Sequence, residues 1–282
     1  MSTAQLQRDE DVKRDDRKLR YYSFGYAVAQ FFGFAIVVLM FYWQANYPLL
    51  GSVAGVPDAV KQTTVGLQWF LSNKPGSNAN RVAHYHPLLM VFGLIFFQAE
   101  GIMAYRSHRH EAKLFGKLLH GGLHLAAFIA SVFGIVAIWR FKDNVMANHL
   151  YSAHSWLGVA TLVLFIVQYL VGFTGFLFPR YAPNGRMWLL PIHRFVGFLL
   201  FLGATATALM GIAEWSYTHG VTSYHFNDTT KTYYYEKCYG RLCMEGVLIN
   251  VLVVSLIGYA LTVVWTTLTN RFKRQPINEK DE

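Results

Sequence analysis

Six long apolar stretches alternate along the chain with shorter polar segments, many of them basic. An α-helix needs roughly 20 apolar residues to cross the hydrocarbon core of a bilayer. The six stretches reach about that length, and they cover residues 21–43, 83–105, 114–139, 150–178, 192–213 and 246–268. The pattern therefore predicts an all-α membrane protein that folds as a six-transmembrane helix bundle.

Polar segments at both ends divide the chain into three parts. Residues 1–20 form a mixed-charge arm, residues 21–269 contain the six spans, and residues 270–282 form a polar tail. Of the 282 residues, 54% are hydrophobic and only 15% are charged, whereas soluble domains are usually about a quarter charged. This composition excludes a disordered chain. Two cysteines exclude a disulfide framework and a four-cysteine metal site.

Lysine and arginine are concentrated on alternate connections between the spans. If the N-terminus is cytoplasmic, 17 of the 25 Lys and Arg residues fall on the cytoplasmic side. This bias predicts that both termini are cytoplasmic. It also explains the net charge of +9 without a nucleic-acid partner.

Two features fall on the predicted outer side of the membrane. Asn227 begins a glycosylation sequon, Asn227-Asp228-Thr229. Cys238 and Cys243 share the same outer loop. We expect these cysteines to form a disulfide, because compartments outside the cytoplasm are oxidising.

Four histidines lie a short way inside four successive spans, where polar side chains are costly and usually functional. The orientation places His86 and His154 near the outer face, and His120 and His193 near the inner face. Each pair can hold one haem through two axial imidazoles. Because such a haem has no open axial position, it suits electron transfer. The histidines therefore predict two b-type haems in the four central helices.

Three alternatives for these positions remain open. Glycines near the histidines, such as Gly121, Gly158 and Gly197, could serve close helix packing alone. His124 lies one turn beyond His120 and could replace it as the ligand. The four histidines could also hold zinc, although pairs on opposite faces of a membrane disfavour a single metal centre.

An ordered set of motifs around these histidines resembles the cytochrome b561 family. The motifs are His86-Pro87-Leu88-Leu89-Met90, Ala104-Tyr105-Arg106, Lys117-Leu118-Leu119-His120-Gly121 and Tyr151-Ser152-Ala153-His154-Ser155-Trp156. The resemblance implies six helices, two b-type haems, an ascorbate-dependent transmembrane oxidoreductase and often a homodimer. It also implies the pairs His86 with His154 and His120 with His193, which the charge bias gives independently.

Basic residues gather where the inner histidine pair approaches the cytoplasm. Lys113, Lys117 and His120 are spaced to share one helix face, and Arg186 lies seven residues before the partner histidine. Haem propionates and ascorbate are anions that such cations would bind, although positive-inside anchoring alone would also place cations here. The resemblance implies an ascorbate site formed by Lys113, Lys117 and Arg186, with Arg106 as a further candidate.

Fewer candidate binding residues lie near the outer histidine pair, where the electron acceptor is expected to bind. Met146 and His149 shortly precede His154 and are candidates for binding the electron acceptor, which is a ferric chelate or monodehydroascorbate. Lys142 stands where some members of the family that the chain resembles have histidine, which disfavours direct iron coordination. Glu100 in the second span could carry a proton or form a buried hydrogen bond.

These features predict a transmembrane enzyme that passes electrons from cytoplasmic ascorbate through two haems to an acceptor on the non-cytoplasmic side. The expected location is the plasma membrane or an endolysosomal or secretory-vesicle membrane. A haem subunit linked to quinone is the alternative enzyme. A haem-free transporter is a different class of protein, which would favour discontinuous helices and inverted repeats; the sequence displays neither.

Overall fold

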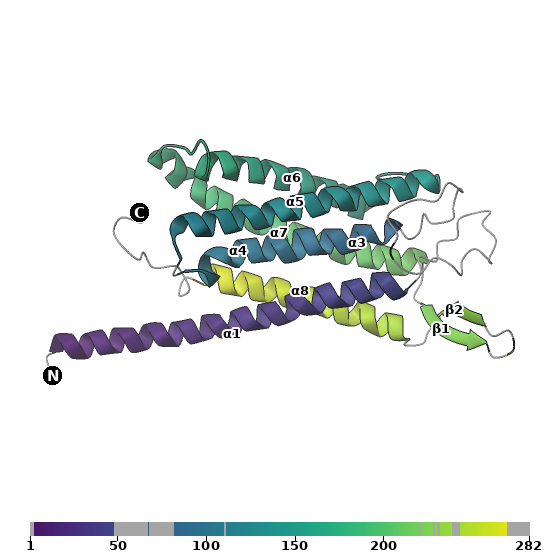
Figure 1. Ribbon diagram of the computed structural model, residues 1–282, viewed down its shortest axis with the longest axis horizontal. Coiled ribbons are helices and arrows are strands. Elements are labelled where there is room, and N and C mark those ends of the chain that lie inside the picture. Colours follow the sequence, from purple (N-terminus) through teal and green to yellow (C-terminus); the bar gives the residue numbers. More distant parts are fainter. Residues whose placement is uncertain are drawn as a thin grey trace.

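Long helices run side by side through the molecule, and a small β-hairpin lies at one end (Figure 1). The computed structural model describes residues 3–47, 67, 82–109, 111–219, 222–227, 229, 232–238 and 243–269. Its helices are α1 (Thr3–Asn46), α3 (Tyr85–Met90), α4 (Gln98–Ser107), α5 (Lys113–Asn144), α6 (Ala153–Phe176), α7 (Pro183–His219) and α8 (Met244–Leu268). A π-helical segment, η2 (Val91–Phe97), joins α3 to α4, and the hairpin consists of β1 (Thr222–Asn227) and β2 (Thr232–Lys237).

Within the described ranges, six helical stretches are long and apolar enough to cross a membrane, which confirms the predicted number of spans. They are Arg20–Asn46, Tyr85–Ser107, Lys113–Asn144, Ala153–Phe176, Pro183–Tyr217 and Met244–Leu268. The fifth begins well before the predicted residue 192, because Pro183 favours the first position of a helix, where no amide hydrogen is needed. The first continues a helix that begins at Thr3, so the arm predicted for residues 1–20 is largely part of α1.

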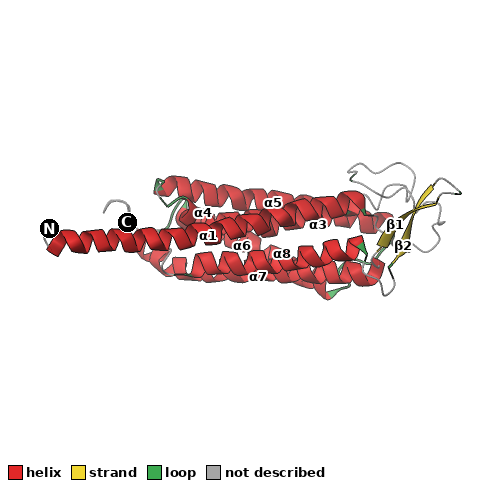
Figure 2. Cartoon of the chain, turned by 90° about the horizontal axis from the view of Figure 1, so that it is seen from below, coloured by secondary structure: helices red, strands yellow, loops and turns green. Residues whose placement is uncertain are grey.

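The spans pack mainly in three pairs. α1 packs against α8, the second span (α3, η2 and α4) packs against α5, and α6 packs against α7. The most buried side chains come from α1, the second span, α7 and α8, and include Ile36, Met103, Phe201 and Tyr259. Figures 1 and 2 show the spans lying roughly parallel along the length of the molecule.

The bundle has two distinct ends. The end of α8 and the α4–α5 and α6–α7 connections lie at one end of the bundle, and the start of α1 projects beyond that same end (Figure 1). We call this the basic end, because Lys113, Lys117, Arg180 and Arg186 lie here. The two strands lie at the opposite end, which we call the hairpin end (Figure 2).

The hairpin adds a pair of strands to the helical fold that the sequence predicts. Its strands are antiparallel, with Tyr224 opposite Tyr235 and Phe226 opposite Tyr233. Aromatic residues and threonine favour extended strands over helices, and this segment is rich in both. Hydrophobic length identified the membrane spans, but it gave no signal for a strand pair outside them.

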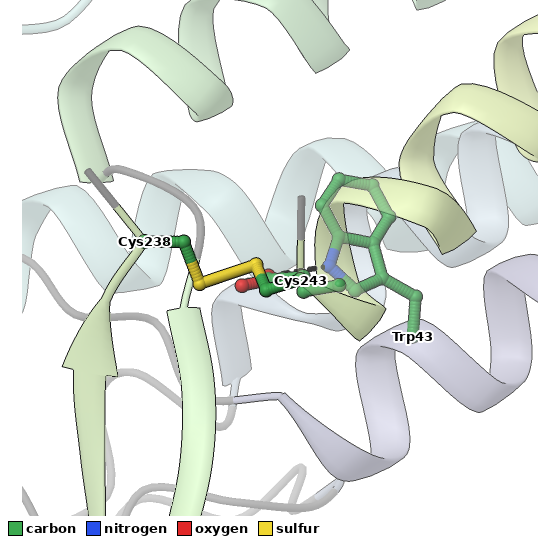
Figure 3. Close-up of a disulfide and its surroundings, with 4 residues drawn as sticks. Trp43, Cys238 and Cys243 are labelled. Atoms are coloured by element: carbon green, nitrogen blue, oxygen red, sulfur yellow. Dashed lines mark hydrogen bonds between the residues drawn. A yellow bond between two sulfur atoms is a disulfide. The ribbon is translucent and has the colours of Figure 1, made fainter. Parts of the chain in front are cut away.

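A disulfide between Cys238 and Cys243 links the end of β2 to the start of α8 (Figure 3). Cys243 is the N-cap residue of α8, and Glu245 lies in the first turn of that helix. The Glu245 carboxylate accepts a hydrogen bond of 2.9 Å from the Trp43 indole of α1. A carboxylate also suits the positive N-terminal end of a helix. The hairpin, α8 and α1 are therefore fastened together at this end.

Candidate haem sites and substrate mouths

Two pairs of histidine rings face each other within the bundle. The ring centres of His86 and His154 are 6.1 Å apart, and those of His120 and His193 are 6.2 Å apart. A metal–imidazole bond is about 2.0 to 2.1 Å long, and the ring centre lies roughly 1 Å farther, so two axial imidazoles place their ring centres about 6 Å apart. The structure thus brings the four histidines together in the two pairs that the sequence predicts.

Backbone carbonyls orient both rings of the pair nearer the hairpin end. A capping box between Ser152 and Ser155 starts α6, so His154 lies in its first turn. The Nδ1 atom of His154 is 2.9 Å from the Thr207 carbonyl oxygen of α7, and Nδ1 of His86 is 3.1 Å from the Gly134 carbonyl oxygen of α5. Because a carbonyl only accepts, each Nδ1–H donates, which leaves Nε2 as the nitrogen able to bind a metal.

The pair nearer the basic end is held in two different ways. His120 donates from Nδ1 to the Gly101 carbonyl oxygen at 2.7 Å. Nδ1 of His193 is buried and has no hydrogen-bond partner among the described residues. Instead, the Gln168 amide of α6 donates to the backbone carbonyl of His193 at 2.6 Å. Sequence reasoning missed Gln168, although an amide inside an otherwise apolar span was an available signal.

Glycines beside the histidines fit a flat group. A Cβ atom built on Gly211 would lie 2.7 Å from His154 Cε1, and one on Gly172 would lie 2.8 Å from His193 Cε1. Larger residues at these two positions would displace the rings. A Cβ on Gly121 or Gly122, next to His120, would meet no atom within 4 Å. Protein packing alone therefore does not require glycine at either of these two positions.

The number of protein ligands distinguishes haem from zinc. Within the part of the chain that the structure describes, no group of three or more His, Cys, Asp or Glu side chains could hold a metal ion. A zinc site usually takes three or four ligands from the protein. Each pair here supplies two imidazoles, which suits a metal whose remaining ligands come from a macrocycle. The residues present therefore fit haem at both pairs.

His124, the alternative ligand, lies beside the pair nearer the basic end. Its ring centre is 4.4 Å from that of His120 and 5.8 Å from that of Phe165. A Cβ on Gly101 would lie 2.8 Å from its Nε2 atom. His120 donates from Nδ1 to a backbone carbonyl, as His86 and His154 do. The geometry therefore favours His120 as the ligand.

Four cations converge at the basic end. Lys117 lies close enough to Lys113, Arg180 and Arg186 for electrostatic interaction, and it donates a 3.0 Å hydrogen bond to the Phe176 carbonyl oxygen at the end of α6. The Nε atom of Arg186 is buried and has no partner among the described residues. We call Lys113, Lys117, Arg180 and Arg186 the basic mouth, and it is suited to bind an anion.

Arg180 is the member of this cluster that the sequence did not identify as a candidate. It lies in the α6–α7 connection, where its backbone amide donates to the Thr174 carbonyl oxygen at 3.0 Å. Spacing along one helix relates Lys113 to Lys117, but it says nothing about a connection from elsewhere in the chain. The proximity of Arg180 to Lys117 is therefore a tertiary feature.

Arg106, the further candidate for the ascorbate site, makes contacts between two helices. Its side chain is buried, and Nη1 donates to the carbonyl oxygens of Thr266 and Thr269 at 2.8 Å each. These carbonyls lie at the end of α8, which has few backbone donors left to satisfy them. Arg106 thus fastens α4 to α8, and we leave it out of the basic mouth.

At the hairpin end, the two candidates from sequence lie in the α5–α6 connection. His149 bonds to Asp143 at 2.8 Å and stacks on Trp139 with ring centres 4.1 Å apart. Met146 is 93% exposed. Among the contacts of the described residues, none joins either side chain to His86 or His154.

Other residues of the hairpin end form a cluster that acts electrostatically on His86. The Tyr151 hydroxyl donates to Glu214 at 2.8 Å, and Lys142 Nζ lies 4.6 Å from the centre of the Tyr151 ring. Both Lys142 and Glu214 are close enough to His86 to interact electrostatically. Burial, with the hydrogen bond to Glu214, raises the pKa of Tyr151 to about 12, so this phenol remains a donor at neutral pH.

Glu214 was missed by sequence reasoning. The available signal was a carboxylate at the hairpin end of the fifth span, three residues after Gly211. The hairpin-end mouth therefore contains Lys142, Tyr151 and Glu214.

Comparison with known proteins gives consistent matches. Residues 85–219 match the family model described as eukaryotic cytochrome b561. The chain is similar to the transmembrane ascorbate-dependent reductase CYB561 of Ovis aries, with 39% identity over 70% of this chain and 72% of that protein. It is also similar to the human lysosomal membrane ascorbate-dependent ferrireductase CYB561A3, with 31% identity over 80% and 88% of the two chains. A putative homologue from Caenorhabditis elegans is 24% identical over 96% of this chain and 91% of its own.

Proposed function

The chain belongs to the cytochrome b561 family, and on that premise we propose that it moves electrons from cytoplasmic ascorbate through two b-type haems to an acceptor across the membrane. Its relatives are named as ascorbate-dependent reductases, and one as a ferrireductase. The two-haem path, the direction of transfer and the acceptor are the parts that we add to the family assignment.

The observation that carries this proposal is the presence of two facing histidine pairs at different depths, one on the second and fourth spans and the other on the third and fifth. His120 and Gly134, whose carbonyl holds His86, lie on one helix and are fourteen residues apart. This separation corresponds to about 21 Å at 1.5 Å per residue. Two redox centres at such a spacing would divide an electron's passage across a hydrocarbon core of about 30 Å into shorter steps.

Each haem would supply one-electron redox chemistry when bound between its two imidazoles. The protein holds the rings in one orientation through the Gly101, Gly134 and Thr207 carbonyls. Gln168 fixes the backbone at His193. Orientation of the axial ligands and exclusion of water are the means by which a protein tunes such a centre.

The basic mouth is the proposed site for ascorbate. Ascorbate is a monoanion at neutral pH, and Lys113, Lys117, Arg180 and Arg186 supply complementary charge beside the His120–His193 pair. The Nε atom of Arg186 offers a buried donor. Charge-assisted hydrogen bonds of this kind are stronger than those between neutral groups. Binding here would hold ascorbate beside the first redox centre.

The hairpin-end mouth is the proposed site for the acceptor, a ferric chelate or monodehydroascorbate. Lys142 offers positive charge, and Tyr151 and Glu214 form a hydrogen-bonded pair beside it. We place this end on the non-cytoplasmic side. The plasma membrane, endolysosomes and secretory vesicles are the proposed locations, and similarity to a lysosomal ferrireductase favours an endomembrane. A homodimer is part of the same proposal.

Haem content tests the redox path. Purified wild-type protein should contain two b-type haems with bis-histidine spectra. His154→Ala should lose the haem nearer the hairpin end, and His120→Ala should lose the other, each variant keeping about one haem. Two normal haems in His120→Ala would transfer the ligand role to His124 or overturn the pairing, and a haem-free wild type would overturn the proposal.

Stopped-flow absorbance tests the direction and the acceptor. Anaerobic ascorbate should reduce both haems of the wild-type protein. Mixing the reduced protein with ferric citrate or with monodehydroascorbate should then reoxidise it, and the faster reaction identifies the better acceptor. Failure of ascorbate to reduce a protein that dithionite does reduce would exclude ascorbate as the donor.

A further inference from the structure

Glu100 is a carboxyl group within the second span that the proposed electron path does not use. It accepts hydrogen bonds from Gln30 Nε2 at 2.7 Å and from the Tyr259 hydroxyl at 3.0 Å. The Tyr26 hydroxyl approaches at 3.5 Å. Among the described residues, no Lys or Arg lies within ion-pair distance of it. Three neutral donors thus converge on a carboxylate without balancing its charge.

This carboxyl group lies next to the redox centre nearer the basic end. Glu100 immediately precedes Gly101, whose carbonyl oxygen accepts the hydrogen bond from His120. The Glu100 side chain points to α1 and α8, whereas Gly101 contacts α5. A change of charge at one position therefore changes the electrostatic potential at the other, because the two are close together in a medium of low dielectric constant.

The ionisable groups around Glu100 come from several elements. α1 contributes Tyr22 and Tyr26, α8 contributes Tyr259, and the end of α4 contributes His108. On the α5 side of α4, the nearest such groups are His120 and His124. Farther toward the basic end, Arg106 and Arg109 lie near Tyr22, and Arg194 of α7 lies near Arg106.

We propose that Glu100 is a proton-binding site coupled to electron transfer: it takes up one proton when the His120–His193 centre gains an electron and releases it when that electron leaves. This inference rests on the proposed function. The iron–porphyrin core of an oxidised haem with two neutral imidazoles would carry one net positive charge, which would offset the Glu100 carboxylate. Reduction removes that charge, and an uncompensated carboxylate within a membrane is costly.

The oxidation of ascorbate supplies both the electron and the proton. Ascorbate monoanion loses one electron and one proton when it becomes the monodehydroascorbate radical anion. The electron enters the His120–His193 centre, and one proton converts the Glu100 carboxylate into a carboxylic acid by forming an O–H bond. When the electron passes to the second centre, that O–H bond breaks and the proton returns to the basic end.

Polar side chains mark a route between Glu100 and the basic end. The hydroxyl of Tyr26 contacts Glu100 at 3.5 Å, and Ser107 lies near enough to Tyr26 to influence it electrostatically. Ser107 Oγ is 2.9 Å from His108 Nδ1 at the end of α4. His108 and Ser107 at the end of α4, with Tyr26 beside Glu100, are therefore the polar groups that lie between the basic end and the buried carboxyl.

Redox titration over about pH 5.5 to 8.5 tests the coupling. In the wild-type protein, the midpoint potential of the His120–His193 centre should fall as pH rises. The slope should approach about 59 mV per pH unit, the value for one proton per electron. Glu100→Gln cannot change its charge, so that slope should be lost, while the His86–His154 centre should behave as in the wild type.

Glu245→Gln is the matched control. Glu245 is also a buried carboxyl group that accepts a hydrogen bond between α1 and α8, but it lies at the hairpin end. This variant should keep the wild-type slope. Equal slopes in the wild type and Glu100→Gln would overturn the proposal.

Infrared difference spectra provide a direct readout. Reduction of the wild type should produce the C=O stretching band of a protonated carboxyl group, and this band should be absent from Glu100→Gln. If that variant does not fold, Tyr259→Phe keeps the carboxyl group and removes one donor to it. The pH-dependent slope should then move to higher pH, and an unmoved slope would overturn the proposal.

The two proposals fail in different ways. A wild-type protein with two haems, ascorbate reduction and a pH-independent potential would overturn only the proton site at Glu100. A wild-type protein without haem would overturn the proposed function.

Discussion

At the scale of single residues, backbone carbonyls orient three of the four paired histidines. Gly134, Thr207 and Gly101 each accept from an Nδ1–H group. A carbonyl fixed in a helix cannot rotate away or change its charge, so it holds the imidazole in one orientation. Electron transfer benefits from this rigidity, because the ligands need not reorganise between the two redox states.

The cations of the basic mouth give the first prediction. Lys117→Ala and Arg186→Ala should each raise the ascorbate concentration that half-reduces the haems by about ten- to a hundredfold. A hydrogen bond to a charged group contributes roughly 1.5–3 kcal/mol. Stopped-flow absorbance at a series of ascorbate concentrations measures the change, and dithionite should still reduce both haems.

Two further variants show whether position matters as well as charge. Lys117→Arg keeps the charge but changes the geometry of the donors, so it should recover only part of the ascorbate affinity. Arg140→Ala removes a cation from the opposite end of α5 and should leave ascorbate affinity unchanged. Wild-type kinetics in a Lys113, Lys117 and Arg186 triple-alanine variant would assign these cations to membrane topology alone.

At the scale of secondary-structure elements, the second span has three separate tasks. Its α3 segment carries His86, and its α4 segment carries the Glu100 carboxyl group and the Gly101 carbonyl. The π-helical segment η2 lies between them. Such a turn alters the angular relation between the residues on either side. The directions of these groups are thus set by η2 as well as by regular helical spacing.

Gly93 of η2 gives the second prediction. A Cβ at this position would lie 2.8 Å from the Ala127 carbonyl oxygen of α5. Because that atom belongs to the backbone, Gly93→Ala must push the second span away from α5, and overpacking of this kind typically costs about 1–3 kcal/mol. Thermal unfolding in detergent, followed by circular dichroism and haem absorbance, should show a lower midpoint and weaker haem retention.

Gly134→Ala is the control for this experiment. A Cβ there would meet its nearest atoms at 3.4–3.5 Å, which is ordinary contact, and the variant keeps the carbonyl that holds His86. It should unfold close to the wild-type temperature. Equal stability of Gly93→Ala and the wild type would show that η2 and α5 can separate without cost.

At the scale of the whole molecule, the even number of spans and the uneven distribution of charge place the start of the first described helix, the end of the last and the basic mouth at one end of the bundle. Six spans bring the start of α1 and the end of α8 to one end (Figure 1). That end also contains the basic mouth. Under the proposed function, one surface would therefore both attract an anionic electron donor and satisfy the positive-inside rule.

Asn227 gives the third prediction, which concerns orientation. It is the last residue of β1, at the hairpin end. If this end faces the lumen or the cell exterior, glycosidase treatment of protein made in a eukaryotic cell should reduce its apparent mass. Asn227→Gln should remove that change and keep both haems. Cleavage of the hairpin by protease added to the cytoplasmic face of sealed vesicles would reverse the orientation.

The sequence by itself determined the features that depend on local composition and depth. Apolar length identified six spans, and the family followed from motifs that lie on them. The positions of His86, His120, His154 and His193 within those spans, combined with the charge bias, grouped them by depth. Depth in a bilayer follows from distance along a helix, so pairing could be predicted without coordinates.

Only the tertiary structure decided which side chains meet from different elements. Arg180 approaches Lys117, Gln168 bonds to the backbone of His193, and Arg106 fastens α4 to α8. Glu100 meets donors from α1 and α8, which are far away in sequence. Helical spacing fixes neighbours only along one helix, whereas these contacts depend on how helices rotate and pack against one another.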